Sequence, residues 1–239
     1  MRLKRLRRSR ARKHRFEKMF TTTWPVSYYA KFENIDGHQF RFDTRIYLDF
    51  CAHPEPDGVC VAAVVGKNPG SARTTSIGHW GPLMLDGDKL LPSIRNRFLT
   101  AYAAAKKSVP SAAYVRVWNL FYLCDADLNN ACEKLKNCVN PGHCKSEAVE
   151  APPILWAVWG GPDDRLDKMK ERFSQRVVLN SFFFCNTTQQ VAKRMATKSD
   201  FARHTQGLPA EPIIEHLAAR IQSTDRTQRK SAEEHSANS

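Results

Sequence analysis

Two asparagines stand where apolar segments give way to loops, and their side chains could take part in catalysis or recognition. Asn68 follows the apolar residues 59–65, and its carbonyl oxygen could hold a water molecule, although an amide is not a strong base. Asn119 lies within residues 114–121, and its amide offers the donor and acceptor that suit a pyrimidine edge. Each also has a structural interpretation, Asn68 as a turn residue before proline and Asn119 as a hydrogen-bonded strand end.

Three further residues have aromatic or titratable side chains. Trp80, within residues 78–82 (GHWGP), offers an aromatic face, or it could be an ordinary core tryptophan. His204 and Glu211 lie on either side of a turn and could act as acid or base. Glu211 could equally cap the helix expected at 211–222.

The elements that must position these residues alternate between strands and helices. Short apolar runs at 59–65, 114–121 and 154–159 predict buried strands, and a fourth strand is expected at 176–180, with a possible extension to residue 184. A strand or hairpin is expected at 38–48. Helices are expected at 92–107, from about residue 128, and at 163–173. This order predicts a three-layer α/β/α fold with a central, mainly parallel four-stranded sheet. Ligands of such sheets bind at the carboxyl ends of the strands.

Four segments in this order resemble the uracil-DNA glycosylase superfamily. They are residues 66–72 (GKNPGSA) with 78–82, residues 117–121 (VWNLF), residues 158–160 (VWG) and residues 207–213 (GLPAEPI). The first is most similar to the mismatch-specific branch, which carries a GINPG loop and then a GHHF-like segment. The set is also similar to an uncharacterised bacterial family with an NPS-type loop, an NLF strand end and a terminal GxPxHPL segment. The resemblance covers roughly residues 59–215.

The resemblance implies excision of a flipped base by hydrolysis of its N-glycosidic bond. It implies that Asn68 positions the water, that Asn119 recognises the base, and that Trp80 stacks on it. The residues expected to bind the base are Gly66, Lys67, Pro69, Gly70, Trp80 and Asn119. The fourth segment departs from the pattern because Glu211 stands where a histidine is usual; His204 could substitute, and both are candidate catalytic residues. Lys67 is the only lysine at a matched position, so a monofunctional enzyme without a Schiff-base step is expected.

Gly70 bears on the substrate. In strict uracil enzymes the matching position holds an aromatic residue that closes the pocket against a group on pyrimidine C5, and glycine leaves that space open. We therefore expect a 5-substituted pyrimidine as substrate, either thymine in a mismatch or a bulky modified cytosine such as phages carry. Removal of hypermodified bases would suit anti-phage defence.

The charge of the chain favours a polyanionic partner. The 239 residues carry a net charge of +13, and residues 1–18 hold ten Lys or Arg against one acid. Residues 1–20 are expected to be a flexible basic arm, residues 21–222 one α/β domain, and residues 223–239 a disordered polar tail. The arm could also be a solvated tail or a transit peptide. The residues expected to contact DNA are Arg7, Arg8, Arg10, Arg12, Lys193, Arg194, Lys198 and Arg203; the last four could equally form a solvated face.

Seven cysteines without a secretory signal favour thiols in the cytoplasm. Four of them lie close together with His143, but their spacing does not match common zinc or iron–sulfur sites; they are Cys124, Cys132, Cys138 and Cys144. No cofactor and no metal is expected, nor a membrane span, and the protein is expected to act on DNA as a monomer.

Two alternatives to a glycosylase stay open. The same fold could serve as a non-catalytic nucleic-acid-binding module, because Asn68 is a weak base and Glu211 departs from the pattern. It could also hydrolyse free nucleotides or nucleosides, in which case the basic arm would be incidental.

Overall fold

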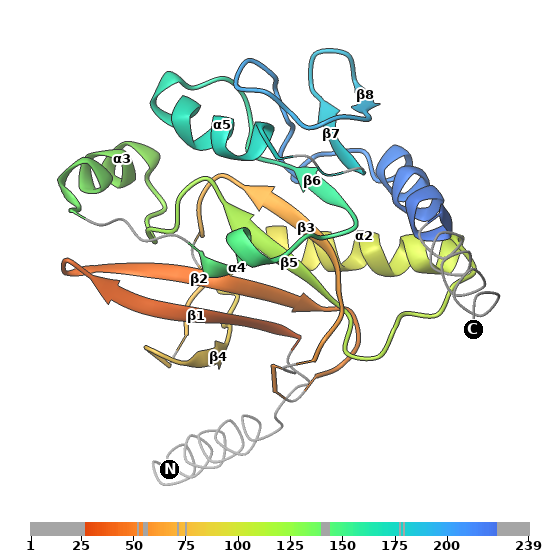
Figure 1. Ribbon diagram of the computed structural model, residues 1–239, viewed down its shortest axis with the longest axis horizontal. Coiled ribbons are helices and arrows are strands. Elements are labelled where there is room, and N and C mark those ends of the chain that lie inside the picture. The colour runs from red at the N-terminus through yellow and green to blue at the C-terminus, as the bar shows by residue number, and fades with distance from the viewer. Residues whose placement is uncertain are drawn as a thin grey trace, which may run out of the picture.

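One sheet of eight strands organises the protein. The computed structural model describes residues 27–51, 53–54, 57–70, 72–74, 76–139, 144–176, 178 and 180–223. Within them the strand order is β4-β1-β2-β5-β3-β6-β7-β8 (Figure 1). The predicted basic arm and nearly all of the predicted tail lie outside the described residues, and so do Arg7, Arg8, Arg10 and Arg12.

Four neighbouring strands run parallel to one another. They are β5 (Tyr114–Asn119), β3 (Cys60–Gly66), β6 (Leu155–Ala157) and β7 (Ser181–Cys185). Nearly every residue in them is buried, as expected for strands covered on both faces. The fourth strand begins later than predicted, because the buried run Phe182, Phe183 and Phe184 forms it rather than residues 176–180.

The predicted four-stranded sheet is wrong in its extent, because antiparallel strands lengthen the sheet on both sides. β1 (Tyr28–Ile35) and β2 (His38–Tyr47) form a hairpin, and β2 pairs antiparallel with β5. β4 (Trp80–Pro82) pairs with β1, and β8 (Gln190–Ala192) pairs with β7. The hairpin turn has positive φ at both central residues, Asp36 (50°) and Gly37 (75°), which matches the twist of the flanking strands. The fold is α/β, with a mixed eight-stranded sheet.

Helices cover both faces of the sheet (Figure 1). On one face, α2 (Leu90–Ala104) and a helix over residues 211–223 pack on one apolar cluster. On the other, α3 (Leu128–Asn137) and α5 (Asp167–Ser174) pack on a second cluster. The short η1 (Asp164–Leu166) leads into α5, and α4 (Lys145–Val149) is held to this face by the bond from Trp118 Nε1 to Ser146 Oγ (3.0 Å).

All seven cysteines are free, and Cys132, Cys138 and Cys144 are buried. In the described part of the chain, no three or more His, Cys, Asp or Glu side chains come together as a possible metal site. His143 lies outside that part. None of the described helices has the length and apolar character that crossing a membrane requires.

Candidate functional site at the carboxyl edge of the sheet

The loops that follow the parallel strands meet at one edge of the sheet, which we call the carboxyl edge. The loop after β3 is tied to the end of β5 by the bond from Leu120 N to Gly66 O (3.0 Å). The segment that carries His204 reaches the ends of β6 and β7, because Gly160 N donates to Ala202 O (2.7 Å). Arg203 N donates to Phe184 O (2.9 Å) on β7. Three of the four segments named in the sequence analysis, residues 66–72, 117–121 and 158–160, therefore meet at this edge together with His204.

Asn119 is locked beneath the loop that follows β3. Asn119 pairs with Gly66 in the strand ladder, and a Cβ on Gly66 would lie 2.9 Å from the Asn119 side-chain amide. In the amide orientation that satisfies its neighbours, its nitrogen donates to Trp118 O (3.3 Å) and Asn68 O (3.2 Å). The side chain is 1% exposed. Glycine at position 66 is thus required by the close approach of Asn119, whose amide supports the backbone of Asn68.

Asn68 has one end of its amide fixed. Its Nδ2 donates to Asp125 O (2.7 Å), and no described donor bonds to its Oδ1. The loop that presents Asp125 O is itself rigid, because the Asp125 carboxylate accepts from Lys134 Nζ and Asn130 Nδ2 (both 2.7 Å). The pKa of Asp125 is lowered, chiefly by the bond from Lys134, so the carboxylate stays ionised. The Asn68 carbonyl oxygen is therefore oriented as an acceptor.

Lys67 reaches across the carboxyl edge from β3 to the end of β6. A Cβ on Gly160 would lie 3.6 Å from both Cε and Nζ of Lys67, so the side chain covers this glycine. Gly160 has φ of +91°, a conformation that favours glycine. The ammonium lies near enough to His204 and Asp163 for its charge to lower the pKa of each. Lys67 thus supplies positive charge at the centre of the edge.

His204 is held as a neutral ring. Burial lowers its pKa below the usual 6.5, the Lys67 charge lowers it further, and Asp88 opposes these effects. Gln206 N donates to His204 Nδ1 (3.4 Å), which assigns the hydrogen of the neutral ring to Nε2. Arg97 fixes the following turn by donating to Leu208 O (3.0 Å). His204 can therefore offer an Nε2–H donor.

A cavity opens beside the Asn68 loop. Its volume is about 460 Å³. Asp125, whose backbone oxygen accepts from Asn68 Nδ2, is one of the residues that line it. Its lining residues are Gln39, Gly70, Ala72, Arg73, Thr74, Cys124, Asp125 and Ala126. Gly70 has φ of +71°, and a Cβ there would lie 3.7 Å from Asp88 Oδ2 without a clash. We call this space the Gly70 cavity.

Trp80 and Glu211 lie apart from this group. Trp80 is on β4, three strands lie between β4 and β3, and the Arg45 guanidinium lies 4.7 Å from the Trp80 ring centroid. The sheet thus directs this tryptophan to a cluster with Tyr29, Tyr47 and Tyr114 rather than to the Asn68 loop. Glu211 is exposed at the start of the helix over 211–223, the position where an acid complements the helix dipole. Pro69 is buried in the loop beside Asn68.

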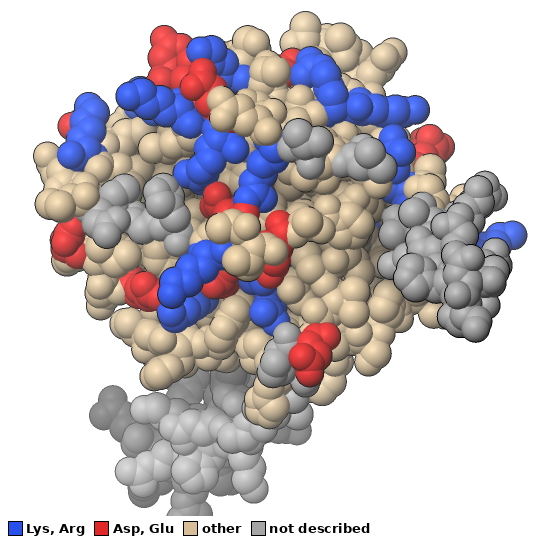
Figure 2. All heavy atoms as spheres, viewed as in Figure 1, with Lys and Arg blue, Asp and Glu red and all other residues tan. Residues whose placement is uncertain are grey.

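The predicted DNA-contacting residues between 193 and 203 lie on a basic surface. Figure 2 shows Lys and Arg side chains gathered over the region of α5, β7 and β8, interspersed with acids. Lys193 is exposed, whereas Arg194 pairs with Asp200 (2.7 Å) and Lys198 pairs with Glu171 (2.9 Å). Arg203 donates to Gly207 O (2.8 Å). Three of the four therefore also have structural contacts.

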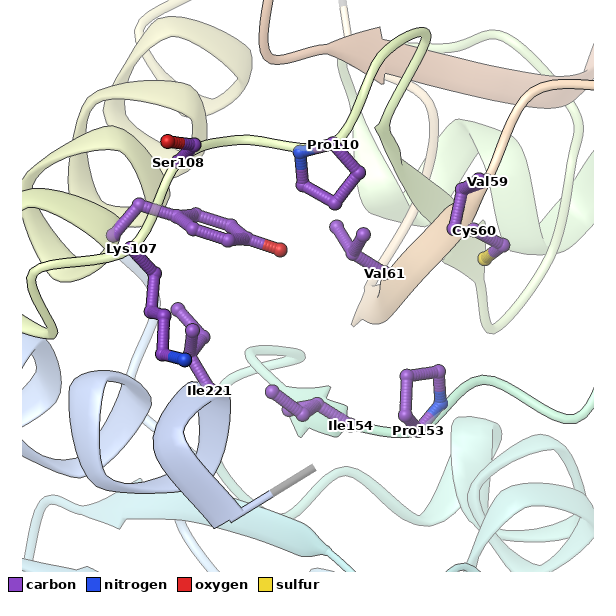
Figure 3. A pocket seen from close by; sticks show the side chains of 10 residues that line it. Val59, Cys60, Val61, Lys107, Ser108, Pro110, Pro153, Ile154 and Ile221 are labelled. Carbon is purple, nitrogen blue, oxygen red and sulfur yellow. The ribbon is translucent and has the colours of Figure 1, made fainter. Parts of the chain in front are cut away.

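A second cavity, of about 530 Å³, lies at the opposite edge of the sheet, where β3 and β6 begin (Figure 3). Its lining residues are Val59, Cys60, Val61, Tyr102, Lys107, Ser108, Pro110, Pro153, Ile154 and Ile221. None of the residues predicted from the sequence to act on a base lines it.

Sequence reasoning missed Asp88, Asp125 and Arg41. Asp88 had a readable signal, since an acid just before an amphipathic helix is a typical cap, and its Oδ1 accepts from Leu90 N (2.8 Å). Asp125 contributes through its backbone carbonyl, for which no sequence signal exists. Arg41 sits between two phenylalanines in a strand, where alternation assigns it to an exposed face.

A scan against models of known protein families found no match for this chain, and searches of curated proteins and of solved structures found none either. The chemistry of the carboxyl edge is therefore inferred from its residues and their geometry.

Proposed function

We propose that the protein is a monofunctional DNA glycosylase that excises a 5-substituted or mismatched pyrimidine. The observation that carries the proposal is the pairing of an oriented Asn68 carbonyl with a cavity left open at Gly70. A flipped nucleotide would place its base in the Gly70 cavity and its sugar against the Asn68 loop. Its action as a monomer in the cytoplasm stays a prediction.

Each group at the carboxyl edge has a role in the proposed reaction. The bond between the base nitrogen and C1′ breaks, and the base takes the electron pair. A water held by Asn68 Oδ1 adds to C1′, and the proton it loses goes to the departing base. The neutral His204 ring donates from Nε2 to an oxygen of that base, and the Lys67 charge favours the anion as it develops.

Two roles implied by the resemblance are absent from this scheme. Trp80 does not take part, because three strands separate β4 from β3 and the Trp80 ring packs with Arg45. Asn119 serves to hold Asn68 rather than to read the base directly, because its amide nitrogen is used within the chain. DNA approaches over the basic surface near α5 and β7, where backbone phosphates would meet Lys193 and its neighbours.

The test is a panel of duplexes that contain uracil, a G·T mismatch, 5-hydroxymethylcytosine or its glucosylated form, together with phage genomic DNA. Released bases are identified by mass spectrometry, and abasic sites by alkaline cleavage. The expected result is release of a 5-substituted base that disappears in Asn68→Ala. Binding without release from any substrate would favour a nucleic-acid-binding module. Release from free nucleosides alone would favour a nucleoside hydrolase. Activity on glucosylated cytosine would fit a role against phage DNA.

A further inference from the structure

Arg41 carries a buried positive charge that the described residues leave uncompensated. The residue is 1% exposed, and neither Nε nor NH1 has a hydrogen-bond partner. No described carboxylate forms an ion pair with it. An isolated charge in a protein interior is costly unless it is paired, so an arginine in this state is incomplete without a ligand.

Arg41 is not one of the residues that line the Gly70 cavity, but its neighbours are. Arg41 is two residues from Gln39 on the same face of β2, and Gln39 lines the cavity. The groups whose negative charge would favour protonated Arg41 are Cys124, which also lines the cavity, and Asp88, which faces Gly70. A ligand that fills the cavity past Gly70 therefore approaches Arg41.

The neighbouring groups do not neutralise it. Burial raises the pKa of the Cys124 thiol to about 11, so the sulfur stays uncharged at neutral pH. The Asp88 carboxylate caps α2, accepting from Leu90 N (2.8 Å) and Leu91 N (3.2 Å). Burial lowers the pKa of Arg41 itself, yet an arginine stays protonated at neutral pH. No group in the described part of the chain therefore supplies the anion that Arg41 lacks.

We infer that Arg41 binds an oxyanion carried on C5 of the flipped pyrimidine, either a phosphate ester or a carboxylate, at the inner end of the Gly70 cavity. The inference rests on the proposed function, because it takes the cavity as the base pocket. A backbone phosphate does not suit Arg41, since it stays outside with the duplex while the base enters. Guanidinium pairs with carboxylate and phosphate through charge-assisted bonds, often two at once.

The first test measures binding without catalysis. Isothermal titration compares the phosphate ester of 5-hydroxymethyldeoxycytidine, 5-carboxydeoxycytidine and the neutral 5-hydroxymethyldeoxycytidine, with inorganic phosphate as a separate probe. At least one charged nucleoside is expected to bind more tightly than the neutral one, by roughly tenfold or more. Arg41→Met should abolish that preference. The preferred charged compound identifies the source of the oxyanion. Lys107→Met is the matched control, because it removes one positive charge beside the cavity at the opposite edge, and it should keep the preference.

Stability gives a readout that a structural arginine would not produce. Without ligand, Arg41→Met is expected to hold or raise the Tm by a few degrees, because it removes an unpaired buried charge. The charged nucleoside should raise the Tm of the parent protein and not that of the variant. A lower Tm for Arg41→Met in the absence of ligand would assign Arg41 to the fold and overturn the inference.

The outcomes separate this inference from the proposed function. If base release depends neither on the charge of the C5 substituent nor on Arg41, the glycosylase proposal stands and the oxyanion site is overturned. Arg41-dependent binding of a charged nucleoside without base release from any DNA would keep the site and overturn the glycosylase. Equal binding of charged and neutral nucleosides, or no binding of any charged one, would overturn the oxyanion site.

Discussion

The two edges of the parallel strands carry cavities of similar size and different chemistry. The Gly70 cavity at the carboxyl edge, about 460 Å³, is lined by Arg73, Asp125 and other polar residues. The cavity at the opposite edge, about 530 Å³, is lined largely by Val, Ile and Pro. Volume alone therefore does not locate the site, whereas the polar groups at the ends of the strands do.

Strand direction explains the contrast. Each crossover from a parallel strand begins at the carboxyl edge, so α2 starts there and its first N–H groups gather there. Asp88 satisfies two of these groups, and its other oxygen faces Gly70. At the opposite edge, the chain enters the strands from helix ends and prolines, which bury apolar side chains. The comparison becomes testable by changing one edge at a time.

The largest expected effect on the rate of base release comes from changing Asn68. Asn68→Ala should slow base release on the order of 10³-fold, because the attacking water loses its position. Single-turnover rates with saturating enzyme measure this. Asn68→Asp keeps an oxygen acceptor but loses the bond to Asp125 O, so it should retain more activity than Asn68→Ala. An Asn68→Ala enzyme with unchanged rates would move the chemistry away from the carboxyl edge.

The next effect concerns His204. His204→Ala should lower the rate about 10²-fold, the usual cost of removing one donor to a developing anion. Burial and Lys67 lower the pKa of His204, so the midpoint of the decline in rate at low pH should lie below 6.5. Protonation adds a hydrogen to Nδ1 and breaks its bond with Gln206 N. The matched variant Lys67→Met removes a positive neighbour, which should raise the pKa of His204 and shift the decline to higher pH. A pH profile that is identical in both proteins would contradict this arrangement.

Closing the Gly70 cavity should change selectivity more than rate. Gly70→Tyr is expected to lower activity on 5-substituted pyrimidines relative to uracil about tenfold or more, because the ring fills the open space. Competition between two duplexes in one reaction measures the ratio directly. Gly70→Asn is the control, since asparagine tolerates the φ of +71° and is small. Equal losses on both substrates in Gly70→Tyr would indicate strain in the loop rather than a closed pocket.

The sequence was sufficient to predict the meeting of two motifs. The apolar runs at 59–65 and 114–121 were expected to be parallel strands, and they became β3 and β5. Parallel strands end at the same edge, where a ligand site was expected, and there the Asn119 amide contacts Asn68 O. Local patterning carried this inference, since both strands are buried and their ends are fixed by glycine or a turn.

The same sequence could not predict Trp80 or Arg41. The position of Trp80 depends on a three-residue strand that pairs with β1, and neither strand has a strong pattern of its own. Arg41 is buried and its backbone N donates to Tyr122 O, so its environment is set by residues far along the chain. Short motifs identified neighbours at strand ends, while tertiary pairing decided which side chains face the cavity.

The smallest expected effect lies at the opposite edge, in the apolar cavity. Ile154→Val removes one methylene from a residue that is 2% exposed, which should lower the free energy of unfolding by about 0.5–1.5 kcal/mol. Urea denaturation measures that change, and single-turnover rates should match those of the parent protein. The mutation enlarges this cavity without touching Asn68, Lys67 or His204, so stability and activity respond separately if the chemistry lies only at the carboxyl edge. A rate that falls well beyond the loss of folded protein would show that the two edges are coupled through β6, which is preceded by Ile154 at one cavity and followed by Gly160 against Lys67.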